Sequence, residues 1–267
     1  MATNAKVVAD SINPAGCRLT TIECTYPHII HSHLLKHRIM SSNTSSSRAV
    51  PTKVLIEQVR TDPFTPKLWG SAKSGMKSGP PLEGEDAEWA RAVHLTAANT
   101  AIAAVILMVE CGVHKEYANR YLEPFLWTTS VISATNWSNF FHLRLSEAAQ
   151  GETKELANVI KAAIDASTPQ QLQPGEFHLP YVDAHEIDGI VTDANIAASV
   201  ARTGRISYQR QGLKQSPEKD MEFYLRGIEN GHWSCYEHVG CAMADDSPSG
   251  NFRGFTQLRK TFKNECY

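Results

Sequence analysis

The stretch 85–111 constrains the fold most, because its apolar residues recur at helical spacing over several turns. Gly112 follows, and a glycine there stops or bends a helix. A second amphipathic pattern covers 148–166. Two long helices of this kind need an apolar layer to pack against. The apolar surface of the first helix is expected to comprise Trp89, Val93, Ala97, Ile102, Val105 and Val109.

Shorter segments predict the rest of the architecture. Residues 7–10 and 19–26 have the alternating, β-branched character of strands, with a turn at 13–16 between them. Val131 and Ile132 fit another short strand. This mixture predicts an α/β (α+β) fold, with a mixed or antiparallel sheet flanked by long helices. Shorter helices are expected over 29–38, 114–122, 137–143, 194–199 and 217–230.

The helix after Ser216 has the clearest boundaries. Ser216 is a good cap, Pro217 suits the first helical position, and Asn230-Gly231 is a good stop. Its inward face is expected to carry Met221, Tyr224, Leu225 and Ile228.

Composition along the chain predicts its organisation. Three prolines and two glycines make 168–193 a connector between segments 1–167 and 194–267, which are expected to form one intertwined domain. The stretch 60–81 is rich in Pro, Gly, Ser and Lys, and a loop of that length is typically a lid, a partner contact or disorder.

The global charge and the cysteines limit the function classes. A net charge of -2 gives no general attraction to nucleic acid or to an anionic membrane. The six cysteines show no Cys-x-x-Cys or zinc spacing, which favours the reduced thiols of a cytoplasmic protein. The apolar run 102–109 is too short to span a bilayer, and no signal peptide is apparent. A soluble, cytoplasmic protein is therefore expected.

Other common sites lack support. The histidines in 26–38 have no carboxylate or cysteine at ligand spacing, so no metal site is expected. No Gly-x-Gly-x-x-Gly, Walker or Gly-x-Ser-x-Gly motif occurs in the sequence, so a Rossmann dinucleotide fold, a P-loop hydrolase and an α/β-hydrolase have no sequence support.

The stretch 36–48 is the first candidate for chemistry. It sets Lys36, His37 and Arg38 ahead of a serine-rich turn and ends on Arg48. Arginine forks suit phosphate oxygens, and clustered serines add small donors that cradle an anion. The competing interpretation is a solvated loop with incidental charges.

Two further segments could bind a ligand. In 136–144, Arg144 at a helix end is free to reach outward, although it could equally be a capping residue beside an aromatic core. In 231–238, the adjacent Glu237 and His238 could hydrogen-bond a ring nitrogen and a ribose. A buried, satisfied histidine beside a surface glutamate is the alternative.

The stretch 36–48 resembles the signature of the flavin-dependent thymidylate synthases: Arg-His-Arg, four residues, Asn-Glu, one residue, Ser, one residue, Arg. Lys36 and Thr44 depart from it, in place of the first Arg and the Glu. The segment 136–150 is similar to the Asn-Phe-x-x-Leu-Arg stretch and Ala-Gln helix of that family, but Thr135 stands near where an arginine is common. Positions that match the signature are His37, Arg38, Asn43, Ser46 and Arg48.

The later segments resemble the family in the wrong order. Residues 201–208 and 231–238 are similar to elements that family members place before Arg-His-Arg. The run 252–260 looks like the one that leads into Arg-His-Arg. The resemblance is thus to a divergent, circularly permuted, phage-type member, and permutation is tolerated where termini are close and the break is exposed.

The resemblance implies methylation of dUMP at C5 to dTMP by an FAD-dependent enzyme, with methylenetetrahydrofolate as donor and NADPH as reductant. It implies no enzyme nucleophile, and a homotetramer with sites between subunits. Hydroxymethylation, another pyrimidine nucleotide, or an inactive nucleotide-binding homologue are the alternatives. The cofactor-binding residues it implies are His37, Arg38, Asn43, Asn139 and His238. The substrate-binding residues it implies are Ser46, Arg48, Arg120 (with Asn119 competing), Arg144, Gln257 and Arg259.

Overall fold

The computed structural model describes residues 1–209 and 216–266, with the side chains of Tyr208 and Gln209 left aside. The similarity of Tyr208 to a family position therefore lies outside the described residues. All six cysteines are free.

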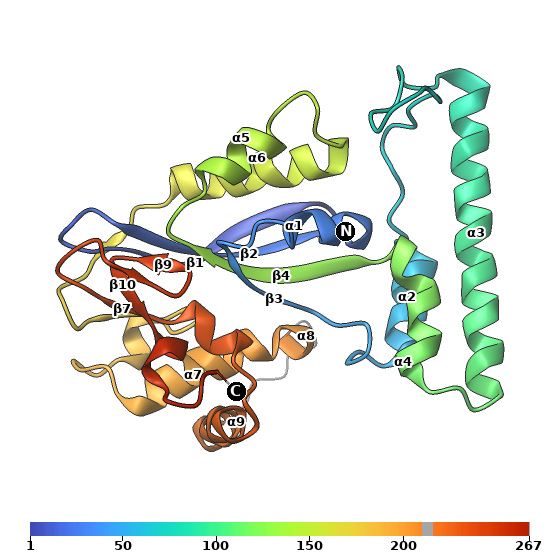
Figure 1. Ribbon diagram of the computed structural model, residues 1–267. Helices are drawn as coiled ribbons and strands as arrows, with labels where there is room; N and C mark the ends of the chain where they lie inside the picture. Colours follow the sequence, from blue (N-terminus) through green and yellow to red (C-terminus); the bar gives the residue numbers. More distant parts are fainter. Residues whose placement is uncertain (210–215, 267) are drawn as a thin grey trace.

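A mixed five-stranded sheet forms the centre, in the order β3-β4-β2-β1-β5 (Figure 1). Its ladders are antiparallel except for the parallel pair of β1 and β5. The predicted mixed sheet is confirmed. The strands are β1 (Asn4–Ile12), β2 (Arg18–Pro27), β3 (Ser41–Thr44), β4 (Trp127–Ala134) and β5 (Gln170–Gln171).

Helices α5 (Ser138–Arg144) and α6 (Gly151–Ala166) cover one face of this sheet (Figure 1). The pattern in 148–166 predicted α6, and its buried Leu156 and Ile160 pack with Ile22 and Ile132 of the sheet. This interface removes large aliphatic side chains from water, each worth about 1.5 to 3 kcal/mol when fully buried.

The C-terminal segment lies against the other side of the sheet (Figure 1). It contains α7 (Asp193–Gly204), α8 (Ile206–Gln209), α9 (Pro217–Asn230) and the short 3-10 helices η4 (Ser234–His238) and η5 (Leu258–Thr261). A small sheet joins β6 (Phe177–His178), β7 (Gly240–Ala242) and β10 (Phe255–Gln257), and β8 (Pro248–Ser249) pairs with β9 (Phe252–Arg253). The segment 168–193 is more than a connector, since it supplies β5, β6 and η3 (Ala184–Glu186).

The long helix α3 (Gly84–Glu110) stands away from the central sheet (Figure 1). It packs on α2 (Thr52–Thr61), α4 (Lys115–Ala118) and the 3-10 helix η2 (Asn119–Phe125), through buried Ala98, Ile102 and Val105. The predicted apolar surface was partly wrong, because Trp89 and Val93 are 71% and 46% exposed. The helix is apolar around most of its circumference, so periodicity did not identify the packed face.

By length and composition α3 is the one helix, within residues 1–209 and 216–266, that could cross a membrane, and 17% of the qualifying window is buried. The expectation that no segment is long enough to span a bilayer considered only the run 102–109, whereas the apolar helix extends over Gly84–Glu110. Length and composition alone do not distinguish a spanning helix from one that packs against protein.

Three other expectations were wrong. The helix 29–38 is only η1 (His28–Ile30) and α1 (His31–Leu34), because the chain must turn within a few residues to enter β3. The serine-rich turn is partly the strand β3, whose Thr44 hydroxyl bonds Ser130 on β4. Leu225 is 56% exposed and does not face inward.

Candidate functional site

The candidate residues lie at three successive places along the edge strand β3 and its flanks. One group precedes the strand, one faces it from the C-terminal segment, and one follows it. Because β3 pairs only with β4, its other edge carries no partner strand among the described residues. The site is therefore built along a sheet edge.

The group before β3 joins His37 to Arg144. Arg144 donates from Nε to Nε2 of His37 over 3.0 Å and from Nη2 to the carbonyl oxygen of His33 over 3.2 Å. Arg144 thus folds back onto the chain, and the expectation that it reaches outward is wrong. The ring of His37 is buried, and it meets Phe140 edge-on at 5.1 Å between centroids. Burial, with the Arg144 guanidinium adding to it, lowers the pKa of His37.

Arg38 and Asn139, the other two candidates from these segments, have exposed side chains. Arg38, with His37 and Met40, lines a small cavity of about 50 Å³. Asn139 lies on α5, the helix that ends at Arg144. Both are available to a ligand that approaches from solvent.

The second group brings the C-terminal segment onto β3. The buried Gln257 donates from Nε2 to Ser41 Oγ over 3.1 Å and to the carbonyl oxygen of Glu237 over 3.0 Å. Asn43 donates to the carbonyl oxygen of Thr203 over 3.2 Å. The run 252–260 thus lies beside 36–48, as the resemblance led us to expect. Gln257 is occupied by these two contacts.

Arg259 and His238 belong to the same group. Arg259 forms an ion pair with Glu237 at 2.5 Å, and a second one with Glu265. His238 is fully buried, and its Nδ1 lies 2.8 Å from Ser133 Oγ on β4. Its Nε2 has no hydrogen-bond partner among residues 1–209 and 216–266. Burial lowers the pKa of His238 to about 3, with His178 adding to it.

The third group follows β3. The backbone N–H of Ser46 donates to Ser207 Oγ over 3.0 Å. The exposed Ser46 hydroxyl oxygen accepts from the backbone N–H of Arg48 over 3.3 Å. Arg48 pairs with Glu116 at 2.9 Å. Arg120 pairs with Glu123 at 2.7 Å. Because both arginines are exposed and paired with carboxylates, a phosphate that binds them would compete with Glu116 or Glu123.

Asn119 is the closer neighbour of the motif. It is fully buried and donates from Nδ2 to the carbonyl oxygens of Ser47 and Val50, at 2.7 and 3.1 Å. Its neighbour Arg120 points instead to solvent and Glu123. Asn119 therefore shapes the loop after β3. The resemblance had left Asn119 and Arg120 as alternatives for one nucleotide-binding position.

No sequence pattern indicated Thr21, Ser133 and His178, which lie behind His238. Thr21 Oγ1 lies 2.6 Å from Ser133 Oγ and 2.8 Å from His178 Nε2. All three are buried polar side chains in strands. Only pairing between distant segments brings them together, and a single sequence does not display that.

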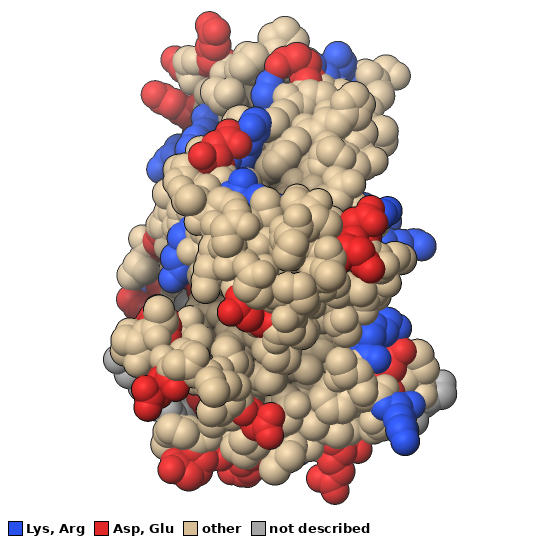
Figure 2. Space-filling model, turned by 90° about the vertical axis from the view of Figure 1, so that its left-hand side faces the viewer, with Lys and Arg blue, Asp and Glu red and all other residues tan. Residues whose placement is uncertain are grey.

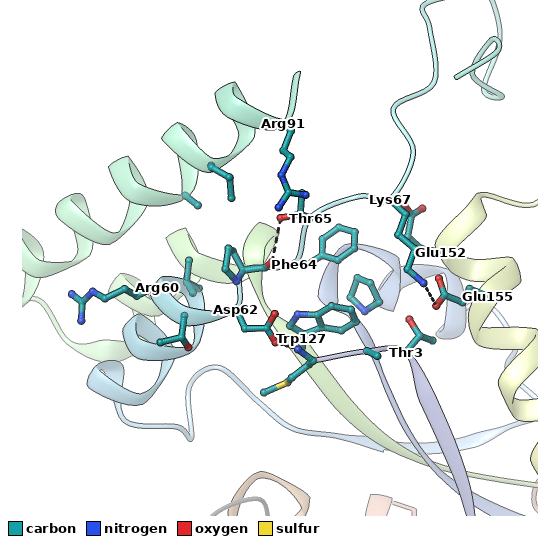
Figure 3. Close-up of a pocket in the computed structure, with 18 of the residues that line it drawn as sticks. Thr3, Arg60, Asp62, Phe64, Thr65, Lys67, Arg91, Trp127, Glu152 and Glu155 are labelled. Carbon is teal, nitrogen blue, oxygen red and sulfur yellow. Dashed lines mark hydrogen bonds and ion pairs between the residues drawn. The ribbon is translucent and has the colours of Figure 1, made fainter. Parts of the chain in front are cut away.

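A larger cavity lies elsewhere. Its volume is about 650 Å³, between α3, α6 and the loop after α2, and the candidate residues do not line it (Figure 3). Arg60, Lys67 and Arg91 lie around it with the Trp127 ring, and Lys67 is paired with Glu155 (Figure 3). The motif residues and this cavity are thus two separate features.

Charge on the outer surface is mixed. On the face shown in Figure 2, Lys and Arg side chains lie among Asp and Glu side chains, and most of the surface is uncharged. Any phosphate recognition on that face must be local.

A comparison with family models identifies the class of protein. The model described as thymidylate synthase complementing protein matches residues 18–170, more than half of the chain. The chain belongs to this family, and the resemblance seen in 36–48 and 136–150 is confirmed at that level. The match ends before the segment that carries His238, Gln257 and Arg259. No curated protein matched the sequence.

Solved structures show more distant similarity. A UMP/dUMP methylase, PolB, from Streptomyces cacaoi bound with 5-Br dUMP is 18% identical, with a TM-score of 0.43, over 55% of this chain and 66% of that chain. The same enzyme with 5-Br UMP is 14% identical, TM-score 0.48, over 61% and 88%. Flavin dependent thymidylate synthase ThyX from Helicobacter pylori, complexed with FAD and dUMP, is 21% identical, TM-score 0.38, over 55% and 67%.

Proposed function

We propose that this protein methylates dUMP at C5 to dTMP, with FAD as redox cofactor, methylenetetrahydrofolate as carbon donor and NADPH as reductant. The observation that carries the proposal is the family match over 18–170, which includes both the 36–48 and the 136–150 motifs. Segments 1–167 and 194–267, joined by 168–193, would act as one catalytic unit in permuted order.

The residues near β3 fit a flavin nucleotide by their chemistry. A flavin dinucleotide needs cations for its phosphates and neutral donors for its ring and ribose. Arg38 and Asn139 supply an exposed cation and amide, and Asn43 a second amide. His238 holds a buried ring nitrogen without a partner in the described part of the chain. When bound, the flavin would supply the electrons that reduce the transferred carbon.

The substrate side of the proposal uses the arginines. Arg48 and Arg120 would bind the nucleotide phosphate in exchange for Glu116 and Glu123. Arg144, held against His37, would face the pyrimidine and stabilise negative charge that develops on its carbonyl oxygens. Ser46, Gln257 and Arg259 would complete the pocket. No side chain is proposed as a nucleophile.

We further propose a homotetramer in which another subunit closes each site. Large apolar side chains of α3 are exposed in the single chain: Trp89, Val93, Ile106, Leu107 and Val109. Covering them with another copy would remove an apolar surface that a soluble monomer seldom presents. The three separated residue groups are consistent with a site completed from outside the chain.

Purified protein tests the cofactor first. A yellow protein with flavin absorbance, or one that takes up added FAD, agrees with the proposal. Colourless protein that binds dUMP but takes up no FAD favours an inactive nucleotide-binding homologue. Thr44 and Lys36 stand where the family has Glu and Arg, so product analysis must also separate methylation from hydroxymethylation and dUMP from other pyrimidine nucleotides.

A further inference from the structure

A continuous chain of hydrogen bonds runs through the interior behind His238. Ser11 Oγ lies 2.9 Å from His178 Nδ1, and His178 Nε2 lies 2.8 Å from Thr21 Oγ1. Thr21 Oγ1 lies 2.6 Å from Ser133 Oγ, which lies 2.8 Å from His238 Nδ1. The five side chains come from β1, β6, β2, β4 and η4.

The five side chains of this hydrogen-bond chain are buried and neutral. Ser11 is 4% exposed, His178 is 1% exposed, and Thr21, Ser133 and His238 are 0% exposed. Burial lowers the pKa of both His178 and His238 to about 3, so neither ring carries a charge near neutral pH. At one end Ser11 is among the residues that line a cavity of about 580 Å³. At the other, Nε2 of His238 has no partner among the described residues.

When Thr21 and Ser133 each donate their hydrogen within this chain of hydrogen bonds, neutrality leaves it two arrangements. Each hydroxyl has one hydrogen to donate, and each neutral imidazole has one N–H and one accepting nitrogen. In one arrangement every bond points toward Ser11, and both rings carry the proton on Nδ1. In the other every bond points toward His238, and both rings carry it on Nε2. The tautomers of the two histidines are therefore tied together.

We propose that Ser11, His178, Thr21 and Ser133 form a proton relay that sets the tautomer of His238 and lets it change without a buried charge. A proton that arrives at Nε2 of His238 is balanced by one that leaves Ser11 Oγ for water in the cavity. In between, each group passes one proton to the next, and no imidazolium or alkoxide remains. His178, Thr21 and Ser133 are positioning residues, since they act through His238.

The arrangement in the free protein follows from the unpaired nitrogen. A buried N–H without an acceptor is rarer and costlier than a buried acceptor without a donor. The free protein therefore holds both rings in the Nδ1–H form, and Nε2 of His238 is an acceptor. The relay rests on these contacts alone, whereas its use in catalysis rests on the proposed function, which places His238 beside the flavin.

Ring nitrogens of histidine can be followed in ¹⁵N-labelled full-length protein by long-range ¹H–¹⁵N NMR, which distinguishes the tautomers. The signals are assigned with His178→Gln and His238→Gln. In the unsubstituted protein both rings are expected in the Nδ1–H form, with equal fractions of the minor tautomer. Ser11→Ala removes the acceptor at the far end, so the Nε2–H to Nδ1–H ratio should rise about fivefold or more in both rings.

Thr21 supplies the control for coupling. In the Thr21→Val background, Ser11→Ala should change the tautomer of His178 and leave that of His238 unchanged. Thr21→Ser, which keeps the hydroxyl, should restore the response of His238. Thr20, next to Thr21 on β2, donates its hydroxyl to Asp10 on β1, and Thr20→Val should leave the coupling intact.

Opposite tautomers in the unsubstituted protein, or a charged ring, would overturn the relay, even if every variant failed to fold. The relay would also be overturned if Ser11→Ala left the tautomer ratio of His238 unchanged. The same holds if Ser11→Ala still changed that ratio in the Thr21→Val background. None of these measurements needs flavin or nucleotide, so failure of the relay is distinct from failure of the proposed reaction.

Discussion

Arg144 holds the ring of His37 through a hydrogen bond of 3.0 Å from its Nε to the Nε2 of the histidine. This contact joins the end of α5 to the turn before β3, so the two motifs within the family match form one surface. Because Nε2 accepts, the neutral ring of His37 carries its proton on Nδ1.

Loss of the arginine side chains should weaken nucleotide binding. Arg48→Ala and Arg144→Ala should each reduce dUMP affinity by about 1.5 to 3 kcal/mol, the size of a lost charged hydrogen bond. Isothermal titration with dUMP measures this directly. Arg60→Ala, which removes an exposed arginine paired with Glu57 outside the β3 groups, is the matched control. Unchanged affinity in both site variants would disprove the assignment of these arginines to the nucleotide.

Glu116 should compete with the phosphate for Arg48. Glu116→Gln removes an exposed ion pair of the kind worth about 0.2 to 1 kcal/mol, so dUMP should bind up to about fivefold more tightly. The gain should shrink at high salt, because salt already screens the pair. Glu57→Gln, which breaks the equivalent exposed pair with Arg60, should leave dUMP affinity unchanged. Weaker binding by Glu116→Gln would argue that this glutamate itself contacts the ligand.

Buried histidines should make the protein sensitive to acid. His178 and His238 have pKa values of about 3 when folded, below the ordinary 6.5. Between these values the unfolded chain binds more protons, so the free energy of unfolding falls as pH falls below about 6.5. Each ring should contribute up to about 1.4 kcal/mol per pH unit in this window. Above pH 6.5 the two rings should have no effect.

Urea unfolding at several pH values between 7 and 5 measures this slope. His178→Gln should reduce the slope of unfolding free energy against pH by the contribution of one histidine ring. His142→Gln, at an exposed histidine, should leave the slope unchanged. A slope that is the same in His178→Gln and in the unsubstituted protein would contradict the role given to burial.

The exposed face of α3 should hold subunits together. Leu107, 61% exposed, is expected to lie in an interface, so Leu107→Glu should shift the protein from tetramer toward smaller species in analytical ultracentrifugation. Ile190→Glu, at a residue 79% exposed and outside α3, should leave the mass unchanged. A monomeric unsubstituted protein would contradict the proposed assembly.

Local patterns predicted the elements whose ends and faces are set by nearby residues. The amphipathic stripe of α6 and the boundaries of α9 are of this kind, and Gly231 ends α9 with a φ of 67°, which favours glycine. Leu225 was misplaced because an apolar residue at helical spacing can also lie at the margin of the packed stripe. Likewise, the serine-rich composition of β3 indicated a turn, whereas pairing with β4 made it a strand.

The candidate site depended on contacts that no local pattern contains. The resemblance identified Gln257 and the return of 252–260 beside 36–48, and the contact between Gln257 and Ser41 agrees with it. It did not indicate that Glu116 and Glu123 would pair with Arg48 and Arg120. Those partners depend on how α4 and η2 pack beside the loop after β3.

Mass spectrometry of the nucleotide product tests the central claim most directly. Protein loaded with FAD is incubated with dUMP, methylenetetrahydrofolate and NADPH, and the Arg144→Ala variant serves as control. The account predicts a product heavier than dUMP by one CH₂ group, carried on the base, and little or none from the variant. Unchanged dUMP, with FAD bound and both co-substrates present, or a product carrying hydroxymethyl in place of methyl, would contradict it.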